Sequence, residues 1–198
     1  MSYASKSPWV IHYDASSCNG CDIEVLAALC PGYDVERFGI INTGNPKHAD
    51  IFLVTGSVNE RNIEVVREIY DQMVEPKVVV ACGICACSGG VFHDCYNVLG
   101  GVDLAIPVDV YAPGCAVRPE AIIDAVVQAV GILDEKSKAL QERRKSERDA
   151  KERAELEERY ERAEGPTQEE YEASESDELA SVLEAAREGT VDEEGGAR

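Results

Sequence analysis

The chain has 198 residues, of which 44% are hydrophobic, with a formal net charge of -19 and eight cysteines. This length and composition suit one packed domain with an extension. The acidic excess excludes a nucleic-acid-binding function, because phosphate contacts need a basic surface. No run of about 18 or more apolar residues occurs, so no transmembrane helix is predicted.

The first residues indicate how the cysteines are used. The segment at residues 1–8 is short and polar, and His12 and Asp14 interrupt the apolar stretch that follows it. This is not the pattern of a signal peptide. We therefore expect a reducing compartment. Cysteines there stay as thiols and serve as metal ligands rather than forming disulfides.

A change of composition near Leu133 predicts two parts. Residues 1–133 hold 16 acids and 7 bases, whereas residues 134–198 hold 22 acids, 12 bases and no cysteine. We predict a folded domain at 1–133 and a charged extension at 134–198. Opposite charges at four-residue spacing, such as Glu155 and Arg159, predict a solvated helix up to Ala163.

The acidic residues after Gly165 and Pro166 predict disorder, with a short helix at 177–187. The extension is expected to be a solvated segment without catalytic or ligand-binding residues. The alternative is that it serves as a docking arm for a partner.

Strand-like and helix-like segments alternate along the predicted domain. In chain order the pattern predicts strand 9–13, helix 21–29, strand 51–55, helix 59–73, strand 77–81, strand 106–111 and helix 119–133. The apolar runs at 51–55 and 77–81 are typical of strands buried on both faces. Helix 21–29 has Ile23, Leu26 and Ala27 on one face. This alternation implies a small doubly wound, flavodoxin-like α/β domain with a parallel sheet.

Six of the eight cysteines follow predicted strands. They are Cys18 and Cys21 in C-N-G-C, Cys82, Cys85 and Cys87 in C-G-I-C-A-C, and Cys115 in Y-A-P-G-C. The loops that follow parallel strands emerge at the same edge of a sheet, where such folds bind ligands. Three loops distant in sequence are therefore expected to bring thiols to one place.

Converging thiolates suit an iron-sulfur cluster or a tetrahedral zinc ion. Glycines surround these cysteines, and small residues let backbone N–H groups approach the sulfurs of a bulky anionic cluster. The helix that starts near Cys21 adds the positive end of its dipole. A cluster is favoured, with zinc and a redox dithiol at Cys18 and Cys21 as alternatives. Spacing alone does not separate Cys85 from Cys87 as a ligand.

Structural roles are expected for the other cysteines and for His12. Cys82 closes an apolar strand and is expected to pack in the core. Cys30 and Cys95 are expected to be ordinary buried small residues.

Three motifs resemble a known family. C-N-G-C-D-I-E at 18–24, G-I-C-A-C-S-G-G at 83–90 and Y-A-P-G-C-A-V-R-P-E at 111–120 resemble the small subunits of nickel-iron hydrogenases and the homologous cluster-bearing subunit of respiratory complex I. The stretch at 39–50 resembles the energy-converting, membrane-bound hydrogenase branch. Complex I members carry adjacent cysteines in the first loop, whereas Asn19 and Gly20 separate them here, which favours the hydrogenase side.

The resemblance implies one 4Fe-4S cluster held by Cys18, Cys21, Cys85 and Cys115. It implies an oxidoreductase subunit that relays electrons and has no catalytic residue of its own. The implied partners are a nickel-iron hydrogenase large subunit, ferredoxin-type iron-sulfur subunits and integral membrane subunits. These would hold the chain in the cytoplasm at the inner face of the cell membrane. A quinone-linked complex I type subunit and a zinc-stabilised binding module are the alternatives.

Overall fold

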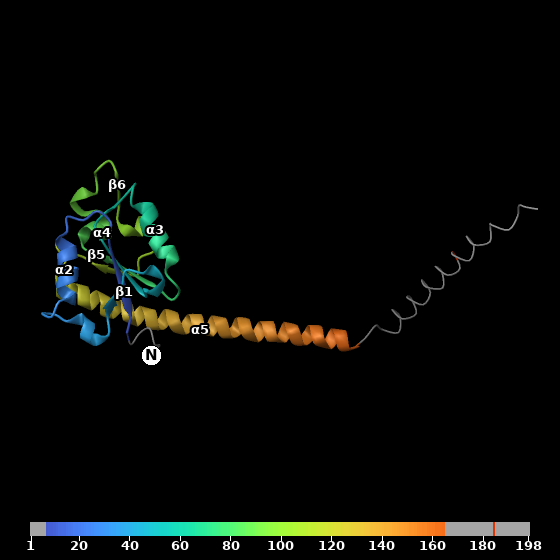
Figure 1. Cartoon of the computed structure of the whole chain (residues 1–198). Helices are drawn as coiled ribbons and strands as arrows, with labels where there is room; N and C mark the ends of the chain where they lie inside the picture. Colours follow the sequence, from blue (N-terminus) through green and yellow to red (C-terminus); the bar gives the residue numbers. More distant parts are fainter. Residues whose placement is uncertain (1–6, 165–183, 185–198) are drawn as a thin grey trace, which may run out of the picture. The chain divides into compact units, whose positions relative to one another are not determined.

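The structure is a computed structural model that describes residues 7–164 and Glu184 (Figure 1). The main strands and helices are β1 (Trp9–Asp14), α2 (Gly20–Leu29), β2 (Ile41–Asn42), β3 (Ile51–Thr55), β4 (Val58–Asn59), α3 (Ile63–Gln72), β5 (Val78–Cys82), α4 (Ile84–Ser88), β6 (Val98–Gly100), β7 (Val110–Ala112) and α5 (Pro119–Glu164). Four short 3-10 helices are η1 (Val35–Phe38), η2 (Pro46–His48), η3 (Gly90–Phe92) and η4 (Val102–Leu104).

Five of the strands form one parallel sheet. Their order is β2-β1-β3-β5-β7, which is the flavodoxin-like order of doubly wound folds. The central strands pair in register, with Val10 opposite Ile51 and Ile51 opposite Val78. Strands β4 and β6 form a separate antiparallel pair. The predicted fold class is confirmed.

Alternate residues of the central strands build two cores. On one face Leu53 and Val80 pack with Val25 of α2 and with the first part of α5. On the other face, which α3 covers (Figure 1), Phe52 packs with Val66 of that helix. Because helices cover both faces, β3 and β5 are buried along their whole length, which accounts for their continuous apolar sequences.

The predicted strand at 106–111 is wrong in its first half. The N–H groups of Ala105 and Ile106 bond back to the carbonyl of Val102, so the chain turns there. Pro107 has no N–H to give to a strand ladder. Only Val110–Ala112 pair with β5.

The residues predicted to share one face of helix 21–29 do not form its buried face. Helix α2 buries Val25 and Ala28 against the sheet, whereas Ile23 is 64% exposed and Leu26 is 54% exposed. Helix α3 keeps the predicted apolar positions, because Val66 and Met73 are buried and Ile69 packs beside them. It begins at Ile63 rather than at residue 59, since Asn59 pairs in strand β4.

Helix α5 passes residue 133 without a break. Ser137 and Leu140 are buried, and Nζ of Lys136 lies 2.7 Å from Oδ1 of Asp109 and 3.1 Å from the carbonyl oxygen of Lys77. By its internal contacts the chain divides into the units Met1–Arg144 and Lys145–Arg198. The domain boundary at 133 stays a prediction.

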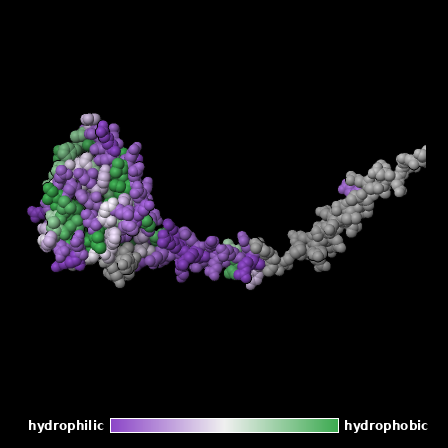
Figure 2. Space-filling model, in the orientation of Figure 1, coloured by the Kyte–Doolittle hydropathy of each residue, from purple (hydrophilic) through white to green (hydrophobic). Residues whose placement is uncertain are grey.

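The solvated helix predicted after residue 134 is present as the later part of α5. From residue 145 to Tyr160 its residues are exposed and largely hydrophilic (Figure 2). Lys151 and Glu155 form an ion pair of 3.9 Å across one turn. The predicted disordered end and the helix at 177–187 lie outside the described residues, apart from Glu184. Within the part of the chain that is described, no helix has the length and apolar character needed to cross a membrane.

Two truncations test where the folded unit ends. A chain ending after Leu133 is expected to have a free energy of unfolding about 2 kcal/mol lower than that of the full chain, because it lacks the buried Leu140 side chain. A chain ending after Arg144 keeps Leu140 and Lys136 and is expected to match the full chain. Urea denaturation measures both. Equal midpoints for the two truncations would show that the folded unit needs nothing beyond residue 133.

Candidate functional site

The carboxyl ends of four parallel strands line up at one edge of the sheet. Thr55, the last residue of β3, pairs with Asp14 of β1 and with Cys82 of β5. Cys82 in turn pairs with Ala112, the last residue of β7. The segment after β1 carries Cys18 in a loop and Cys21 in the first turn of α2. Cys85 lies in the first turn of α4 after β5, and Cys115 lies in the loop after β7.

Backbone hydrogen bonds tie these loops to one another. The N–H of Gly83 donates to the carbonyl of Ala112 at 2.8 Å, and the N–H of Ile84 donates to the carbonyl of Gly114 at 2.9 Å. The loop after β1 is fixed to β3 by a bond of 2.8 Å from the N–H of Ala15 to the carbonyl of Thr55. The cysteines are therefore carried on loops and helix starts that the sheet holds in place.

The four thiols at this edge act on one another electrostatically. Burial raises the pKa of the Cys85 thiol, and the thiolates of Cys115, Cys21 and Cys18 raise it further. Burial also raises the pKa of the Cys21 thiol; a hydrogen bond with the backbone of Val117 opposes the rise, and Asp22, Cys18 and Cys115 add to it. A cationic metal group among these sulfurs would offset their mutual repulsion and deprotonate them.

Cys85 and Cys87 have different surroundings. The Cys87 thiol donates to the carbonyl oxygen of Ala81 at 3.6 Å and packs against the core on the α3 side. Burial raises the pKa of Cys87 to about 11. Cys115 and Cys18 both raise the pKa of Cys85, but neither of them raises the pKa of Cys87. These differences favour Cys85 over Cys87 as the partner of Cys18, Cys21 and Cys115, and the choice of ligand stays a prediction.

The remaining cysteines fall into two groups. Cys82 is fully buried at the end of β5, as predicted. The prediction that Cys30 and Cys95 are buried is wrong, because both are exposed. Cys30 caps the end of α2 and Cys95 follows η3, so each lies where the chain turns at the surface.

Glycines lie against three of the four thiols. A Cβ atom added to Gly83 would come 2.5 Å from Sγ of Cys21, one on Gly90 would come 3.3 Å from Sγ of Cys85, and one on Gly20 would come 3.5 Å from Sγ of Cys18. The small size of glycine lets the backbone approach the sulfurs closely. Four cysteine thiolates are the donor set of cubane iron-sulfur clusters, so the residues present fit such a group.

A site for a single metal ion is a separate question from a site for a cluster. Within residues 7–164 and Glu184, no group of three or more His, Cys, Asp or Glu side chains is arranged to hold a metal ion.

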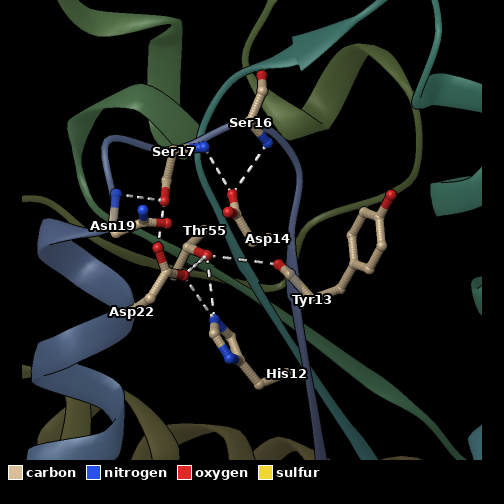
Figure 3. A network of polar contacts seen from close by, with 8 residues as sticks. All are labelled: His12, Tyr13, Asp14, Ser16, Ser17, Asn19, Asp22 and Thr55. Carbon is tan, nitrogen blue, oxygen red and sulfur yellow. Dashed lines mark hydrogen bonds and ion pairs between the residues drawn. The ribbon is translucent and has the colours of Figure 1, made fainter.

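A polar network joins the segment from Ser16 to Asp22, which contains Cys18 and Cys21, to strands β1 and β3 (Figure 3). The Asp22 carboxylate contacts His12, Ser17 and Thr55. Burial would raise the pKa of Asp22, but the hydrogen bonds from Ser17 and Thr55 and the charge of His12 outweigh it and lower the pKa. The sequence carries no motif for this network, because its members come from β1, the following loop, α2 and β3.

A family model matches the part of the chain that carries the candidate site. The family described as "NADH ubiquinone oxidoreductase, 20 Kd subunit" matches residues 18–129, more than half of the chain and all four candidate ligands. The chain belongs to this family. Its members are subunits of oxidoreductase complexes, which confirms the predicted class of protein and the predicted resemblance.

Individual relatives extend over much of the folded unit. A protein of Pyrococcus furiosus named "Probable membrane-bound hydrogenase subunit mbhJ" is 50% identical over 65% of this chain and 77% of its own length. A subunit of the NADH-quinone oxidoreductase of Leptospira biflexa is 50% identical over 58% of this chain and 60% of its own length. Among solved structures, a chain of the membrane-bound sulfane sulfur reductase, an archaeal respiratory membrane complex, is 36% identical with a TM-score of 0.59, covering 67% of this chain and 73% of that one.

Proposed function

We propose that this chain is the electron-transferring subunit of a membrane-associated nickel-iron hydrogenase, with one 4Fe-4S cluster bound by Cys18, Cys21, Cys85 and Cys115. The observation that carries the proposal is the convergence of these four thiols at the carboxyl edge of the sheet, where the other three are close enough to raise the pKa of Cys85. Glycines leave room beside three of the four.

The residues of the chain have a defined task in this proposal. A bound cluster supplies a one-electron acceptor and donor. The four thiols hold it, and they must lose their protons to do so. Because burial raises the pKa of Cys21 and Cys85 in the free chain, loading with iron releases protons and is expected to weaken as the pH falls.

Exposed apolar side chains near the cysteine loops support a partner surface. Val91 is 86% exposed and Tyr96 is 98% exposed, and both follow α4, the helix that carries Cys85. Ile23 and Leu26 of α2 are also exposed, and hydrophobic side chains gather over this helix (Figure 2). We assign this surface to the nickel-iron large subunit. Ferredoxin-type subunits take the electrons onward, and integral membrane subunits hold the assembly at the inner face of the cell membrane.

The C-N-G-C loop and the relative named as a membrane-bound hydrogenase subunit favour the hydrogenase assignment. The structural similarity to a sulfane sulfur reductase chain favours a second candidate, a relay subunit of a sulfur-reducing membrane complex. The relative from Leptospira favours a quinone-linked complex I type subunit. All three functions use the same relay site.

Purification of the native complex without oxygen separates these candidates. The hydrogenase assignment predicts nickel in the complex, and reduction of the cluster of this chain under hydrogen, followed by its EPR signal. A nickel-free complex whose cluster is reduced by NADH or oxidised by sulfane sulfur would reject the hydrogenase assignment and keep the relay. One zinc and no iron in the chain would reject the relay itself in favour of a zinc-stabilised module.

A further inference from the structure

The Asp22 carboxylate is the centre of the network in Figure 3, and it directly follows Cys21 in the chain. We propose that Asp22 is a positioning residue for the loop of Cys18 and Cys21, and that its fixed negative charge lowers the reduction potential of the cluster at this edge. This inference rests on the proposed function, and it goes beyond it by assigning a role to a residue that holds no iron.

Three side chains donate to the Asp22 carboxylate. The hydroxyl of Thr55 donates to Oδ1 at 2.5 Å, and the hydroxyl of Ser17 donates to Oδ2. Nε2 of His12 lies 3.0 Å from Oδ1. Because an ionised carboxylate only accepts hydrogen bonds, His12 contributes its Nε2–H. A carboxylate with several donors in a largely enclosed site keeps its negative charge, since each donor favours the ionised form.

The same contacts fix the backbone between Cys18 and the sheet. The oxygen of Ser17 that donates to Asp22 also accepts the N–H of Asn19 at 2.9 Å. Ser16 and Asn19 have φ angles of 96° and 65°, which L-residues rarely adopt, so this loop needs external support. Part of this support comes from Oδ1 of Asp14, which accepts the N–H groups of Ser16 at 2.9 Å and Ser17 at 2.5 Å. Asp22 supplies another part by linking Ser17 in the loop to Thr55 at the end of β3.

The position of Asp22 makes its charge effective. Asp22 directly follows Cys21 in α2, and its Oδ2 accepts the hydroxyl of Ser17, the residue before Cys18, so the carboxylate lies between two proposed ligands. Reduction adds a negative charge to a cluster, and a fixed negative charge nearby opposes that step. Net charge near the sulfurs is one of the factors that set cluster potentials.

Substitution of Asp22 in the full-length chain, reconstituted with iron and sulfide without oxygen, tests the proposal. Asp22→Asn removes the charge and keeps the shape. It is expected to shift the reduction equilibrium about tenfold toward the reduced cluster, which is about 59 mV for a one-electron couple. EPR-monitored redox titration measures the shift.

Asp50→Asn is the matched control. Asp50 is also a partly buried carboxylate, and its Oδ2 accepts the N–H of Trp9 at 2.9 Å. It lies just before β3, at the opposite end of the strand from Thr55. This control is expected to leave the potential unchanged.

Each outcome gives a decision. An Asp22→Asn chain with a full cluster and the same potential as Asp50→Asn overturns the proposal. If Asp22→Asn takes up no iron, Asp22→Glu decides: recovery of iron by the charged residue supports the role of the carboxylate, and continued failure overturns it. A wild-type chain that binds no cluster rejects the proposed function instead, so the two failures are distinguishable.

Discussion

Cys85→Ser is expected to abolish the cubane cluster, whereas Cys87→Ser is expected to keep it. The thiols of Cys115, Cys21 and Cys18 all raise the pKa of Cys85, whereas Cys87 donates to the carbonyl of Ala81 in the core on the α3 side. Removing one of four thiolate ligands leaves an incomplete set for a cubane. Iron and sulfide analysis of chains reconstituted without oxygen, with visible absorption spectra, measures the difference.

The other cysteines extend the same experiment. Cys18→Ser, Cys21→Ser and Cys115→Ser are expected to behave like Cys85→Ser. The wild-type chain is expected to bind about four irons and four sulfides. The exposed Cys30 provides a matched control, because its removal changes neither the core nor the group of four thiols. Loss of the cluster in Cys87→Ser together with its retention in Cys85→Ser would show that the ligand assignment is wrong.

The location of the site could be predicted from topology, but the choice between neighbouring thiols could not. Alternating strands and helices predict a parallel sheet, and such a sheet gathers the loops after its strands at one edge. Cys85 and Cys87 both follow β5, and their spacing from that strand allows either of them to be the ligand. Both cysteines lie in α4, two positions apart in the sequence. Residues at that spacing on an α-helix point about 200° apart around its axis, so the two thiols face different surroundings.

Tertiary contacts explain the other differences between prediction and structure. Helix α2 exposes Ile23 and Leu26 although both are strongly apolar, and an exposed apolar helix face is what a subunit of a larger complex presents to a partner. The Asp22 network joins residues of β1, α2 and β3, and Thr55 is 33 positions from Asp22 in the sequence. A polar residue at the end of an apolar strand has no periodicity that would reveal such a contact.

Gly83→Ala is expected to prevent normal cluster binding without removing any ligand. Gly83 has φ 87° and ψ 157°, a region that is essentially restricted to glycine, so a side chain there costs about 1–3 kcal/mol. The added Cβ would also lie 2.5 Å from Sγ of Cys21, and the thiol would have to move. Backbone adjustment would strain the bond of 2.8 Å from the N–H of Gly83 to the carbonyl of Ala112.

Gly131→Ala is the control for this substitution. Gly131 lies inside α5, and an added Cβ atom there would meet nothing within 4 Å, so alanine is expected to stabilise the chain by about 0.5–1 kcal/mol through higher helix propensity. Urea denaturation of the iron-free chains gives the stability of each variant, and iron content after reconstitution gives the occupancy of the site. We expect Gly83→Ala to lose most of its iron and Gly131→Ala to keep all of it. A Gly83→Ala chain with full iron and an unchanged spectrum would show that the thiols need no open backbone at this position.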